Sequence, residues 1–535
     1  MSAFDWLPEL LERFKADYVL IHEDAAVTTV GRARVLELDA EDWGRAAGVA
    51  AKFNLRWAGG WADQLTDQLG GDKLQINACL LHQGDVLLLR TRVPVTTPVL
   101  PSHTLHYPGA DRMERHTQDM YGVVFSDHPD PRRWARHHAW GENEYPLRAE
   151  FPRMGTRGDM PARTDDNYRF LQAQGAGLYE IPVGPVHAGI IEPGHFRFTA
   201  VGEQVLNLEQ RLGYVHKGIE KIAVGRDAVG AARLAGRVSG DSTVAFTWAA
   251  CMAMEQAAGV EVPLRANYLR AIMAERERVA NHLGDIGAIC NDVGFAFAFY
   301  QFSRLREDWQ RLSREVFGHR LLMDCVVPGG VARDIDAAAV AQLRAAFAPM
   351  KREMRELMPI LYDNPSLEDR LITTGFLSES LARLLGATGY VGKASNCDLD
   401  ARRDLAYSPY DRFKIKVHVF QDGDVLARMR VRADEILISL DLIDELLAGL
   451  PNGDVRAEWP MPAAGSEGLG IVEGWRGETL VYVRFAEDGK IARLFARDPS
   501  WFTWPALEQL IHGNIVPDFP VCNKSVNGSY SGHDL

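Results

Sequence analysis

The segment RVSGDSTVAF, residues 237–246, carries the most suggestive chemistry in the chain. Its pattern is typical of a metal-binding loop, because a glycine-containing polar stretch leads directly into an apolar run that predicts a buried helix. At the two positions where such a loop would carry cysteines it has Ser239 and Ser242. A serine hydroxyl stays protonated at neutral pH, so it does not offer a metal the anionic ligand that a cysteine thiolate offers. The segment therefore predicts a loop shaped like a metal site without its ligands.

The cysteines do not replace these ligands from elsewhere. They are widely scattered and form no CxxC pair, which excludes the usual zinc and iron–sulfur spacings. We expect most of them to be buried and reduced, since free cysteine is among the most buried residue types. The six positions are Cys79, Cys251, Cys290, Cys325, Cys397 and Cys522.

A second group with chemical potential lies on one predicted helix. Glu275, Arg278 and His282 are spaced at i, i+3 and i+7, so they share one helix face. They fit either a charged relay or a buried structural network, with the network favoured. Arg276 interrupts the apolar stripe of the same helix, and it fits a snorkelling or ion-paired residue better than a functional contact.

The elements that must position these groups fall into two parts. Residues 1–152 alternate short β-rich runs with helical patches, which predicts an α+β domain. A polar, glycine-rich stretch at 153–178 has the composition of a linker. Residues 179–535 predict a mainly α-helical domain with β additions, including helical periodicity from 203, a β-rich insertion from 413 and a β-meander at 469–497.

Composition limits the classes of function. The formal charge of −13 and the pI of about 5.7 oppose general nucleic-acid binding, which depends on clustered Lys and Arg. The first residues, MSAFDWLPELLERF, predict a short amphipathic helix rather than a signal peptide. The most apolar stretch, residues 243–254, is too short to cross a bilayer. We therefore expect any membrane association to come through partners.

A resemblance to known families rests on longer motifs. The segment MERHTQDMYGVVFSDHPDPRRWARHHAWGENEYPLRAEFP, residues 113–152, resembles the signature of the 30-kDa subunit of respiratory complex I and the matching domain of energy-converting hydrogenases. The second part resembles the complex I 49-kDa subunit and the large subunit of group 4 [NiFe] hydrogenases, with the greatest likeness to the fused, formate hydrogenlyase type. Its motifs are VGPVHAGIIEPGHFRF, RLGYVHKGIEKIA, RVSGDSTVAF, RERVANHLGDIGAI, PGGVARD, DVLARMRVRADEILISLDLID and DFPVCNKSVNGSYSGHD.

This resemblance makes the missing ligands specific. In the hydrogenase family two CxxC pairs hold nickel and iron, because soft thiolates suit these metals. The corresponding positions here are Ser239, Ser242, Ser529 and Gly532. We expect no nickel–iron centre to assemble on them and no cofactor to be bound by this chain. Cys522 lacks a paired thiol, and the chain stops soon after this stretch, at Leu535, as expected for a protein without the family's maturation step.

The resemblance also points to polar candidates around the same cavity. Glu192 stands where the hydrogenase family has a proton-handling carboxylate, and in a dry cavity its pKa would be raised. Asp241 is a candidate partner for it. The quinone-binding His and Tyr of the complex I branch fall at about Pro193 and Gly240, so His187 or His195 is the alternative, with a structural role favoured for His195.

One further cavity-lining loop has drifted from the family pattern. The stretch GYVGKASNCDLDARRD, residues 389–404, has Tyr390, Lys393 and Asn396 where the family has Pro, Arg and Gly. A lysine does not reproduce the planar fork of an arginine. The drift fits loss of the original chemistry, and an ordinary surface lysine at 393 is the alternative.

Four hypotheses of function follow. The first is a catalytic-core-type subunit of a membrane-bound, complex I-like oxidoreductase without its nickel–iron site. Its implied partners are a small subunit with a [4Fe–4S] cluster, a ferredoxin-like subunit and antiporter-like membrane subunits, and its implied place is the cytoplasmic face of the inner membrane. The second is a non-catalytic scaffold in such a complex. The third, a quinone-reducing NADH dehydrogenase-type subunit, lacks the usual quinone residues, and an active hydrogenase is the least favoured.

Overall fold

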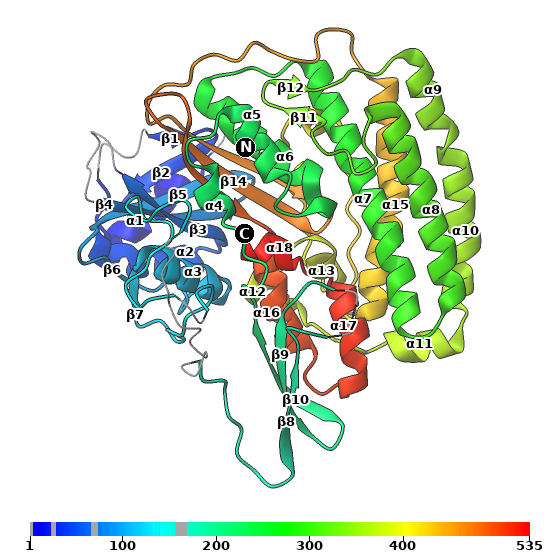
Figure 1. Ribbon diagram of the computed structural model, residues 1–535, viewed down its shortest axis with the longest axis horizontal. Coiled ribbons are helices and arrows are strands. Elements are labelled where there is room, and N and C mark those ends of the chain that lie inside the picture. The colour runs from blue at the N-terminus through cyan, green and yellow to red at the C-terminus, as the bar shows by residue number, and fades with distance from the viewer. Residues whose placement is uncertain are drawn as a thin grey trace.

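The protein is described by a computed structural model that covers residues 4–22, 28–65, 73–137, 140–155, 168–187, 189 and 191–535. A sheet-containing N-terminal part lies at one side and a bundle of long helices at the other, with a second sheet between them (Figure 1). This arrangement confirms the predicted fold class, an α+β domain followed by a mainly helical domain with β additions.

The N-terminal part is built on one five-stranded sheet of order β1-β2-β5-β4-β3. The β2–β5 pair is parallel and the other pairs are antiparallel. β4 and β5 are buried along most of their length, which explains their nearly continuous apolar runs. The elements are α1 (Leu7–Ala16), β1 (Thr29–Val30), β2 (Ala33–Glu37), α2 (Trp43–Lys52), β3 (Arg56–Leu65), β4 (Lys73–His82), β5 (Asp85–Pro94), β6 (Val99–Pro101), α3 (Asp111–Tyr121) and β7 (Val124–Ser126).

The helical bundle is centred on α7 (Leu264–Asp292), which packs against both α8 and α15. Its charged residues are buried together with its apolar stripe, so α7 is a core helix rather than a surface one. The remaining helices are α4 (Ile219–Ala223), α5 (Ala228–Ala235), α8 (Ala296–Phe317), α9 (Ala337–Ala345), α10 (Phe347–Tyr362), α11 (Pro365–Leu371), α12 (Glu379–Leu385), α13 (Gly389–Ala394), α14 (Ala401–Asp404), α15 (Val425–Ala448), α16 (Ser500–Leu510), α17 (Phe519–Val526) and α18 (Tyr530–Asp534).

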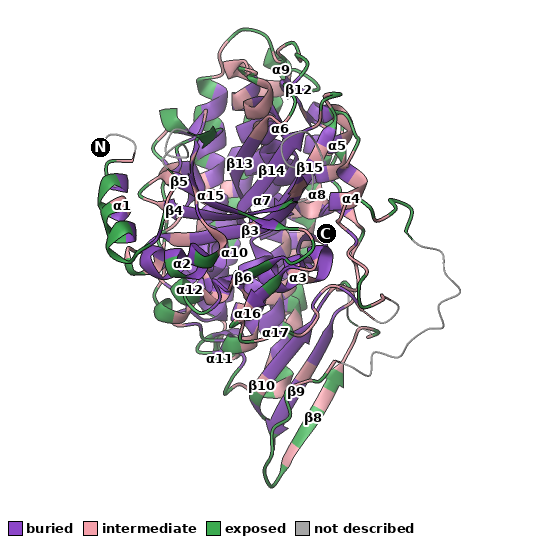
Figure 2. Cartoon of the chain, turned by 90° about the vertical axis from the view of Figure 1, so that its left-hand side faces the viewer, coloured by how far each residue is buried: buried purple, intermediate pink, exposed green. Residues whose placement is uncertain are grey.

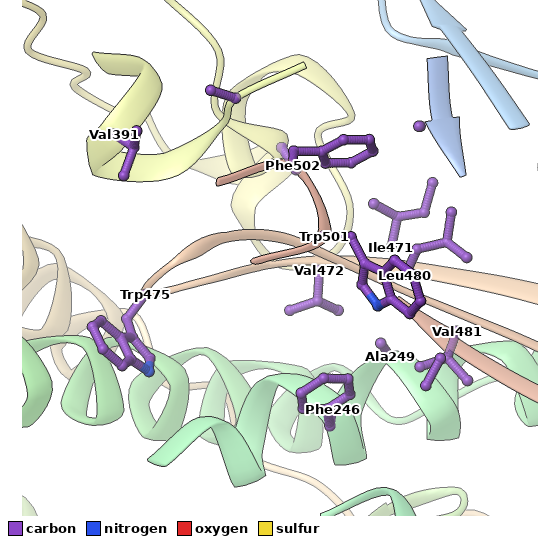
Figure 3. Packing of buried hydrophobic residues seen from close by; sticks show 14 of the residues in the cluster. Phe246, Ala249, Val391, Ile471, Val472, Trp475, Leu480, Val481, Trp501 and Phe502 are labelled. Carbon is purple, nitrogen blue, oxygen red and sulfur yellow. The ribbon is translucent and has the colours of Figure 1, made fainter. Parts of the chain in front are cut away.

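A central antiparallel sheet joins the two parts. It consists of β13 (Glu467–Gly474), β14 (Gly477–Phe485) and β15 (Ile491–Arg497), the predicted meander. The buried helix α6 (Thr243–Ala258) lies directly on β13. The two backbones are so close that a β-carbon at Gly470 would overlap the carbonyl oxygen of Ala249, so only glycine fits there. Figure 3 shows the apolar side chains that fill this layer, with the Trp475 indole at the end of the sheet. The packing fixes the loop before α6 against the turn between β13 and β14.

A smaller antiparallel sheet projects from the molecule next to the C-terminal helices (Figure 1). It consists of β8 (Leu178–Val183), β9 (His195–Val201) and β10 (Gln204–Arg211). β8 is the exposed edge strand, as Figure 2 shows. Two short strands, β11 (Val326–Val327) and β12 (Gly330–Val331), form a separate hairpin.

Two sequence-based predictions of elements are wrong. Residues 204–211 form β10 and not a helix, because they pair with β9; helix begins only at Ile219. Residues 413–424 form no strand and instead run extended over the bundle, where Phe420 exchanges backbone hydrogen bonds with Lys393 and Asn396. The apolar alternation there reflects a one-sided contact with the bundle rather than sheet pairing.

Other predictions have clearer outcomes. All six cysteines are free and buried, as expected. The predicted linker, 153–178, lies partly outside the described residues, which resume at 168. Within the described parts of the chain, no helix has the length and apolar character needed to span a membrane.

Candidate functional site

The positions of the missing ligands come together in the fold, although Ser239 and Ser529 are 290 residues apart in the sequence. Ser239 caps the short 3-10 helix η4 (Gly240–Ser242), which leads into α6, and Ser529 caps α18. The Ser529 hydroxyl donates to Ser239 Oγ at 3.2 Å and accepts from the backbone N–H of Gly532 at 2.9 Å. We call Ser239, Ser242, Ser529 and Gly532 the serine site.

The turn between β13 and β14 forms one wall of the serine site. The Trp475 indole N–H donates to Ser242 Oγ at 3.1 Å. Arg476 donates to the same oxygen at 3.2 Å and to Asp241 Oδ2 at 2.6 Å. Ser239 also donates to the Asp241 carboxylate. Although burial opposes its ionisation, the Arg476 guanidinium holds the pKa of Asp241 below its usual value.

The fourth position is filled by a carboxyl group from another element. Asp498 follows β15 and is almost fully buried. A β-carbon at Gly532 would stand 2.5 Å from Asp498 Oδ2 and 2.9 Å from its Cβ. Oδ1 accepts from the Ser500 backbone at 2.8 Å, whereas Oδ2 has no hydrogen-bond partner among the described residues. Burial raises the pKa of Asp498 above its ordinary value.

These residues do not fit the nickel–iron centre that the family resemblance implies. Three positions offer hydroxyls already engaged in hydrogen bonds, and at the fourth the Asp498 carboxyl occupies the space of a side chain. Hard oxygen donors are poor substitutes for the soft thiolates of such a centre. Across the described residues no group of three or more His, Cys, Asp or Glu side chains is arranged to hold a metal ion. The cluster is suited to hydrogen bonding and proton exchange.

Of the predicted proton-handling residues, Glu192 and Asp241 lie at different edges of this site. Glu192 accepts hydrogen bonds from the backbone N–H and the hydroxyl of Ser531 in α18. It is exposed in this chain, so the expectation of a carboxylate in a dry cavity is wrong here. Asp241 is paired with Arg476 rather than with Glu192.

The two candidate histidines lie in and beside the loop that precedes β9. His195 is buried, and its Nδ1 lies 2.9 Å from the carbonyl oxygen of Gly184, while burial lowers its pKa. This agrees with a structural role. His187 is partly buried, and neither ring nitrogen has a hydrogen-bond partner in the described part of the chain. The loop packs on α18 where Gly194 meets the ring of Tyr530.

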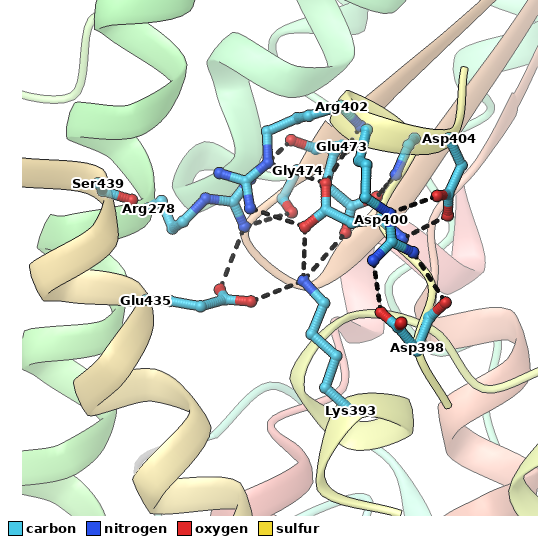
Figure 4. Close-up of polar contacts among 12 residues, drawn as sticks. Arg278, Lys393, Asp398, Asp400, Arg402, Asp404, Glu435, Ser439, Glu473 and Gly474 are labelled. Atoms are coloured by element: carbon cyan, nitrogen blue, oxygen red, sulfur yellow. Dashed lines mark hydrogen bonds and ion pairs between the residues drawn. The ribbon is translucent and has the colours of Figure 1, made fainter. Parts of the chain in front are cut away.

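The residues on the α7 face belong to a large buried network, and Figure 4 shows the part of it around Arg278, Lys393 and Glu435. Arg278 bonds to Glu275 at 3.2 Å and to Glu435 at 3.3 Å. His282 Nε2 lies 2.7 Å from Glu435 Oε2. The three residues do lie together in buried polar contacts, as their spacing predicts, and this geometry fits both the structural network and the relay. Its charged members are Glu275, Arg278, Lys393, Asp400, Arg402, Glu435 and Glu473.

Lys393 is central to this network and is not a surface lysine. It is fully buried, and its Nζ lies 2.7 Å from both Asp400 Oδ2 and Glu435 Oε1. The same Nζ is 3.9 Å from Glu473 Oε1, an atom without a hydrogen-bond partner among the described residues. Burial and the nearby Asp400 raise the pKa of Glu473 to about 8. With Glu473 neutral at pH 7, the cations and anions of the network balance.

Arg276 is neither snorkelling nor ion-paired. Its side chain is buried against the Trp309 ring and donates to Ser313 Oγ and to the carbonyl of Trp309. Nη1 has no partner among the described residues, and no carboxylate lies within ion-pair distance of the guanidinium there. Burial lowers the pKa of Arg276 to about 9, so it stays charged at neutral pH.

A wide cleft lies away from the serine site. It has a volume of about 770 Å³ and runs between the N-terminal part and the second part. One wall includes Arg56 and His82, and the other includes Thr388, Asp400 and Glu473. We call it the interdomain cleft. It therefore reaches the outer members of the buried network.

Sequence reasoning missed three residues of the site: Trp475, Arg476 and Asp498. Trp475 and Arg476 lie in the turn of the meander, and nothing in the spacing of the chain indicates that this turn meets residues 239–242. Asp498 follows directly on the last strand of the meander, where a polar residue normally signals only a strand end. Only the folded arrangement shows that all three face the serines.

Comparison with known proteins gives consistent matches along the chain. The family model described as the 30 Kd subunit of respiratory-chain NADH dehydrogenase matches residues 38–157, and that of the 49 Kd subunit matches residues 292–467. Between them, the model of nickel-dependent hydrogenase matches residues 217–284, which include Ser239 and Ser242.

Individual relatives span most of the chain. Formate hydrogenlyase subunit 5 of Escherichia coli is 32% identical over 489 residues, covering 89% of this chain and 85% of its own length. The C/D subunit of the NADH-quinone oxidoreductase of Phocaeicola vulgatus is 32% identical, covering 73% and 78%. A chain of the membrane-bound sulfane sulfur reductase, an archaeal respiratory membrane complex, is 27% identical with a TM-score of 0.63; the match covers 67% of this chain and 99% of that one.

Proposed function

Because the chain belongs to the family of fused complex I 30-kDa and 49-kDa subunits and membrane-bound hydrogenase large subunits, we propose that it is the catalytic-core-type subunit of a membrane-bound oxidoreductase without a nickel–iron site. The relatives are subunits of formate hydrogenlyase, of NADH-quinone oxidoreductase and of a respiratory sulfane sulfur reductase. The last of these is a respiratory membrane complex, and a second hydrogenase relative, from Pyrococcus furiosus, is a membrane-bound hydrogenase subunit.

The observation that carries the proposal is the filled fourth position. The Asp498 carboxyl occupies the space at Gly532, and Arg476 binds both Asp241 and Ser242. The site thus holds one carboxyl whose pKa is lowered and one whose pKa is raised. Such a pair suits the proton steps that accompany reduction of an acceptor.

In this proposal electrons come from a [4Fe–4S] cluster held by a partner small subunit, itself supplied through a ferredoxin-like subunit. The acceptor is reduced near the serine site, and antiporter-like membrane subunits couple the reaction to ion movement. The subunit sits at the cytoplasmic face of the inner membrane and is held there by these partners. The family motifs HKGIEK and PGGVARD support retained partner contacts, while the ligand positions have changed.

A scaffold without redox chemistry is the second candidate. It is favoured by the hydrogen bonds that the serine-site residues make to one another, Ser529 to Ser239 and Gly532 to Ser529, which need no ligand. It differs from the main proposal in one outcome: changes at the serine site should leave turnover of the complex intact.

The test is to purify the complex from its native membrane and to measure nickel, iron and partner subunits in one sample. We expect iron without nickel, together with membrane subunits. Turnover is then assayed with reduced methyl viologen as donor and polysulfide, decylubiquinone or protons as acceptors. Nickel near one atom per chain, or hydrogen evolution, would contradict the proposal.

Variants separate the catalytic subunit from the scaffold. Asp498→Asn and Arg476→Lys should reduce turnover at least tenfold without loss of partners. Asp488→Asn, at an exposed carboxylate bonded only to the neighbouring Lys490, is the matched control and should have no effect. Unchanged turnover in all three variants would favour the scaffold.

A further inference from the structure

A line of titratable groups runs from the interdomain cleft toward the Trp475 side of the serine site. Its first step joins Glu473 Oε1 to Lys393 Nζ at 3.9 Å. Its second joins Lys393 Nζ to Glu435 Oε1 at 2.7 Å, and its third joins Glu435 Oε2 to His282 Nε2 at 2.7 Å. We call these four residues the buried chain; Figure 4 shows Lys393 between Glu473 and Glu435.

Glu473, the outer member of the buried chain, lines the interdomain cleft. Its Oε1, the atom 3.9 Å from Lys393 Nζ, is buried and has no hydrogen-bond partner within the described residues. At the inner end, His282 Nδ1 is also without a partner there. The His282 ring and the Trp475 indole pack at a steep angle with their centroids 6.0 Å apart, and that indole bonds to Ser242. Buried polar atoms are normally paired, so two such atoms without hydrogen bonds in one line of groups call for an explanation.

We propose that the buried chain conducts protons between the interdomain cleft and the serine site. The use of this relay in turnover rests on the proposed function, because the buried chain would supply the protons that reduction of an acceptor consumes. Conduction itself is a property of this chain alone and is tested without turnover.

The hydrogen bond between His282 and Glu435 decides which ring nitrogen of His282 carries the proton. Despite its burial, the Glu435 carboxyl has a pKa well below its usual value, mainly because of Lys393 and His282. An ionised Glu435 accepts a hydrogen bond from Nε2–H, so Nδ1 is the nitrogen without a proton. Burial lowers the pKa of His282, which keeps the ring neutral.

One proton can move inward with atoms and charge in balance. His282, carrying its proton on Nδ1, releases it toward the serine site. Lys393 then passes a proton through the Glu435 carboxylate to Nε2, so that Glu435 is protonated only in passing and is ionised again at the end. Glu473 returns a proton to Lys393, and cleft water returns one to Glu473. The structure corresponds to the state after such a transfer. A change of tautomer, by turning of the ring, resets the chain.

The neighbouring charges do not interrupt this route. Around Glu473 and Lys393 they lie on α7, on α14 and on the adjoining loop, and around His282 on α7 and α15. These groups are Glu275, Arg278, Asp400, Arg402, Tyr407 and Arg432. Arg278 and Arg402 are fixed by bonds to Glu275 and Asp400. The guanidinium groups of Arg278 and Arg402 therefore hold the buried chain in position. The four members of the buried chain are the groups that gain and lose protons.

The decisive experiment measures exchange of the His282 ring N–H with D2O in the full-length chain, labelled with ¹⁵N-histidine and observed by NMR. The signal is assigned with the variant His282→Gln. Glu473→Gln and Lys393→Met should each slow exchange at least tenfold, because each cuts the path to the cleft. Equal exchange rates in these variants and in the wild-type protein would overturn the proposal.

Two further features keep the result interpretable. Glu473→Gln replaces one neutral group by another of the same size, so it should fold even if Lys393→Met, which strands two carboxylates, does not. The matched control is Glu277→Gln, since Glu277 is another buried carboxyl whose pKa burial raises to about 8. It lies off the buried chain, bonded to the backbone of Val244 and Ala245, and should exchange like the wild type.

A second arm tests whether turnover uses the relay. In the purified complex, with methyl viologen and the acceptor that supports turnover, Glu473→Ala should lose at least tenfold in rate and regain activity when acetate is added to replace the lost carboxyl. A structural role would not give this rescue. Slowed exchange with unchanged turnover would overturn the use of the relay in the reaction. Absence of turnover with every acceptor would contradict the proposed function and leave the exchange result to decide the relay.

Discussion

The carboxyl group of Asp498 lies in the space that a side chain at position 532 would need. The distance from Oδ2 to a β-carbon at Gly532 would be 2.5 Å, well inside van der Waals contact. The serine site is thus not an empty version of a metal pocket, since an oxygen-rich cluster has taken its place. This relationship leads to the first of four predictions.

Gly532→Ala should destabilise the protein by about 1–3 kcal/mol, the usual cost of an extra methyl group in a packed interior. Asp498→Ala in the same chain should remove most of this cost, because it deletes the atoms that overlap. Urea unfolding of the wild type, both single variants and the double variant measures the coupling. Additive effects in this cycle would mean that the two positions do not compete for space.

Arg276→Met should leave the free energy of unfolding unchanged or raise it by about 1–4 kcal/mol, because it removes a buried cation that has no carboxylate partner. Arg270→Met is the matched comparison on the same helix. Arg270 is paired with Glu255 at 2.6 Å, and its loss should cost about 3–5 kcal/mol by leaving that carboxylate alone. Thermal unfolding of both variants checks the order; similar destabilisation of the two would contradict it.

Stability should fall with rising pH in a way that depends on Glu473. Its pKa is about 8 in the folded state and about 4.3 in an unfolded chain, so between these values the folded state binds the extra proton. Its contribution to stability is therefore present at low pH and is lost as pH rises through this window.

Glu473→Gln removes that dependence and should gain stability over the wild type, on the order of 3–4 kcal/mol more at pH 8 than at pH 5. Urea midpoints measured at both pH values give the difference. The exposed Asp488→Asn serves as control, and a Glu473→Gln profile parallel to that of the wild type would refute the assignment.

Native thiols should react slowly. Burial raises the pKa of Cys79 and of Cys522 to about 12 and that of Cys325 to about 11, so little thiolate exists at pH 8. We expect negligible labelling by Ellman's reagent in the folded chain and six equivalents after denaturation. Rapid labelling of Cys522 in the native protein would show that the region around α17 opens.

Much of the fold could be predicted from the sequence, because the long elements have strong patterns. α7 and the meander of β13–β15 agree with the predicted helix and hairpins. The failures have physical causes. The spacing at 204–211 predicts a helix, but pairing with β9 decides the structure of these residues, and apolar residues at short intervals fit both.

The candidate site was predictable only in part. The positions of the serines were fixed by motif spacing, and the structure brings them together. Arg476 and Asp498 could not be found, because no local pattern reports which turn meets which loop when, as for Arg476 and Ser242, the two are 234 residues apart. The burial of Lys393 was equally hidden, since a lysine is usually exposed and only paired carboxylates make its burial tolerable.

The hairpin of β13 and β14 contacts both parts of the molecule. At its tip, Arg476 donates hydrogen bonds to Ser242 of the serine site and to the neighbouring Asp241. Just below, Glu478 is bound to Arg56 of the first sheet, and Glu473, its cross-strand partner, faces the cleft. One hairpin thus ties the first sheet, the serine site and the cleft to one another through Arg56, Arg476 and Glu473.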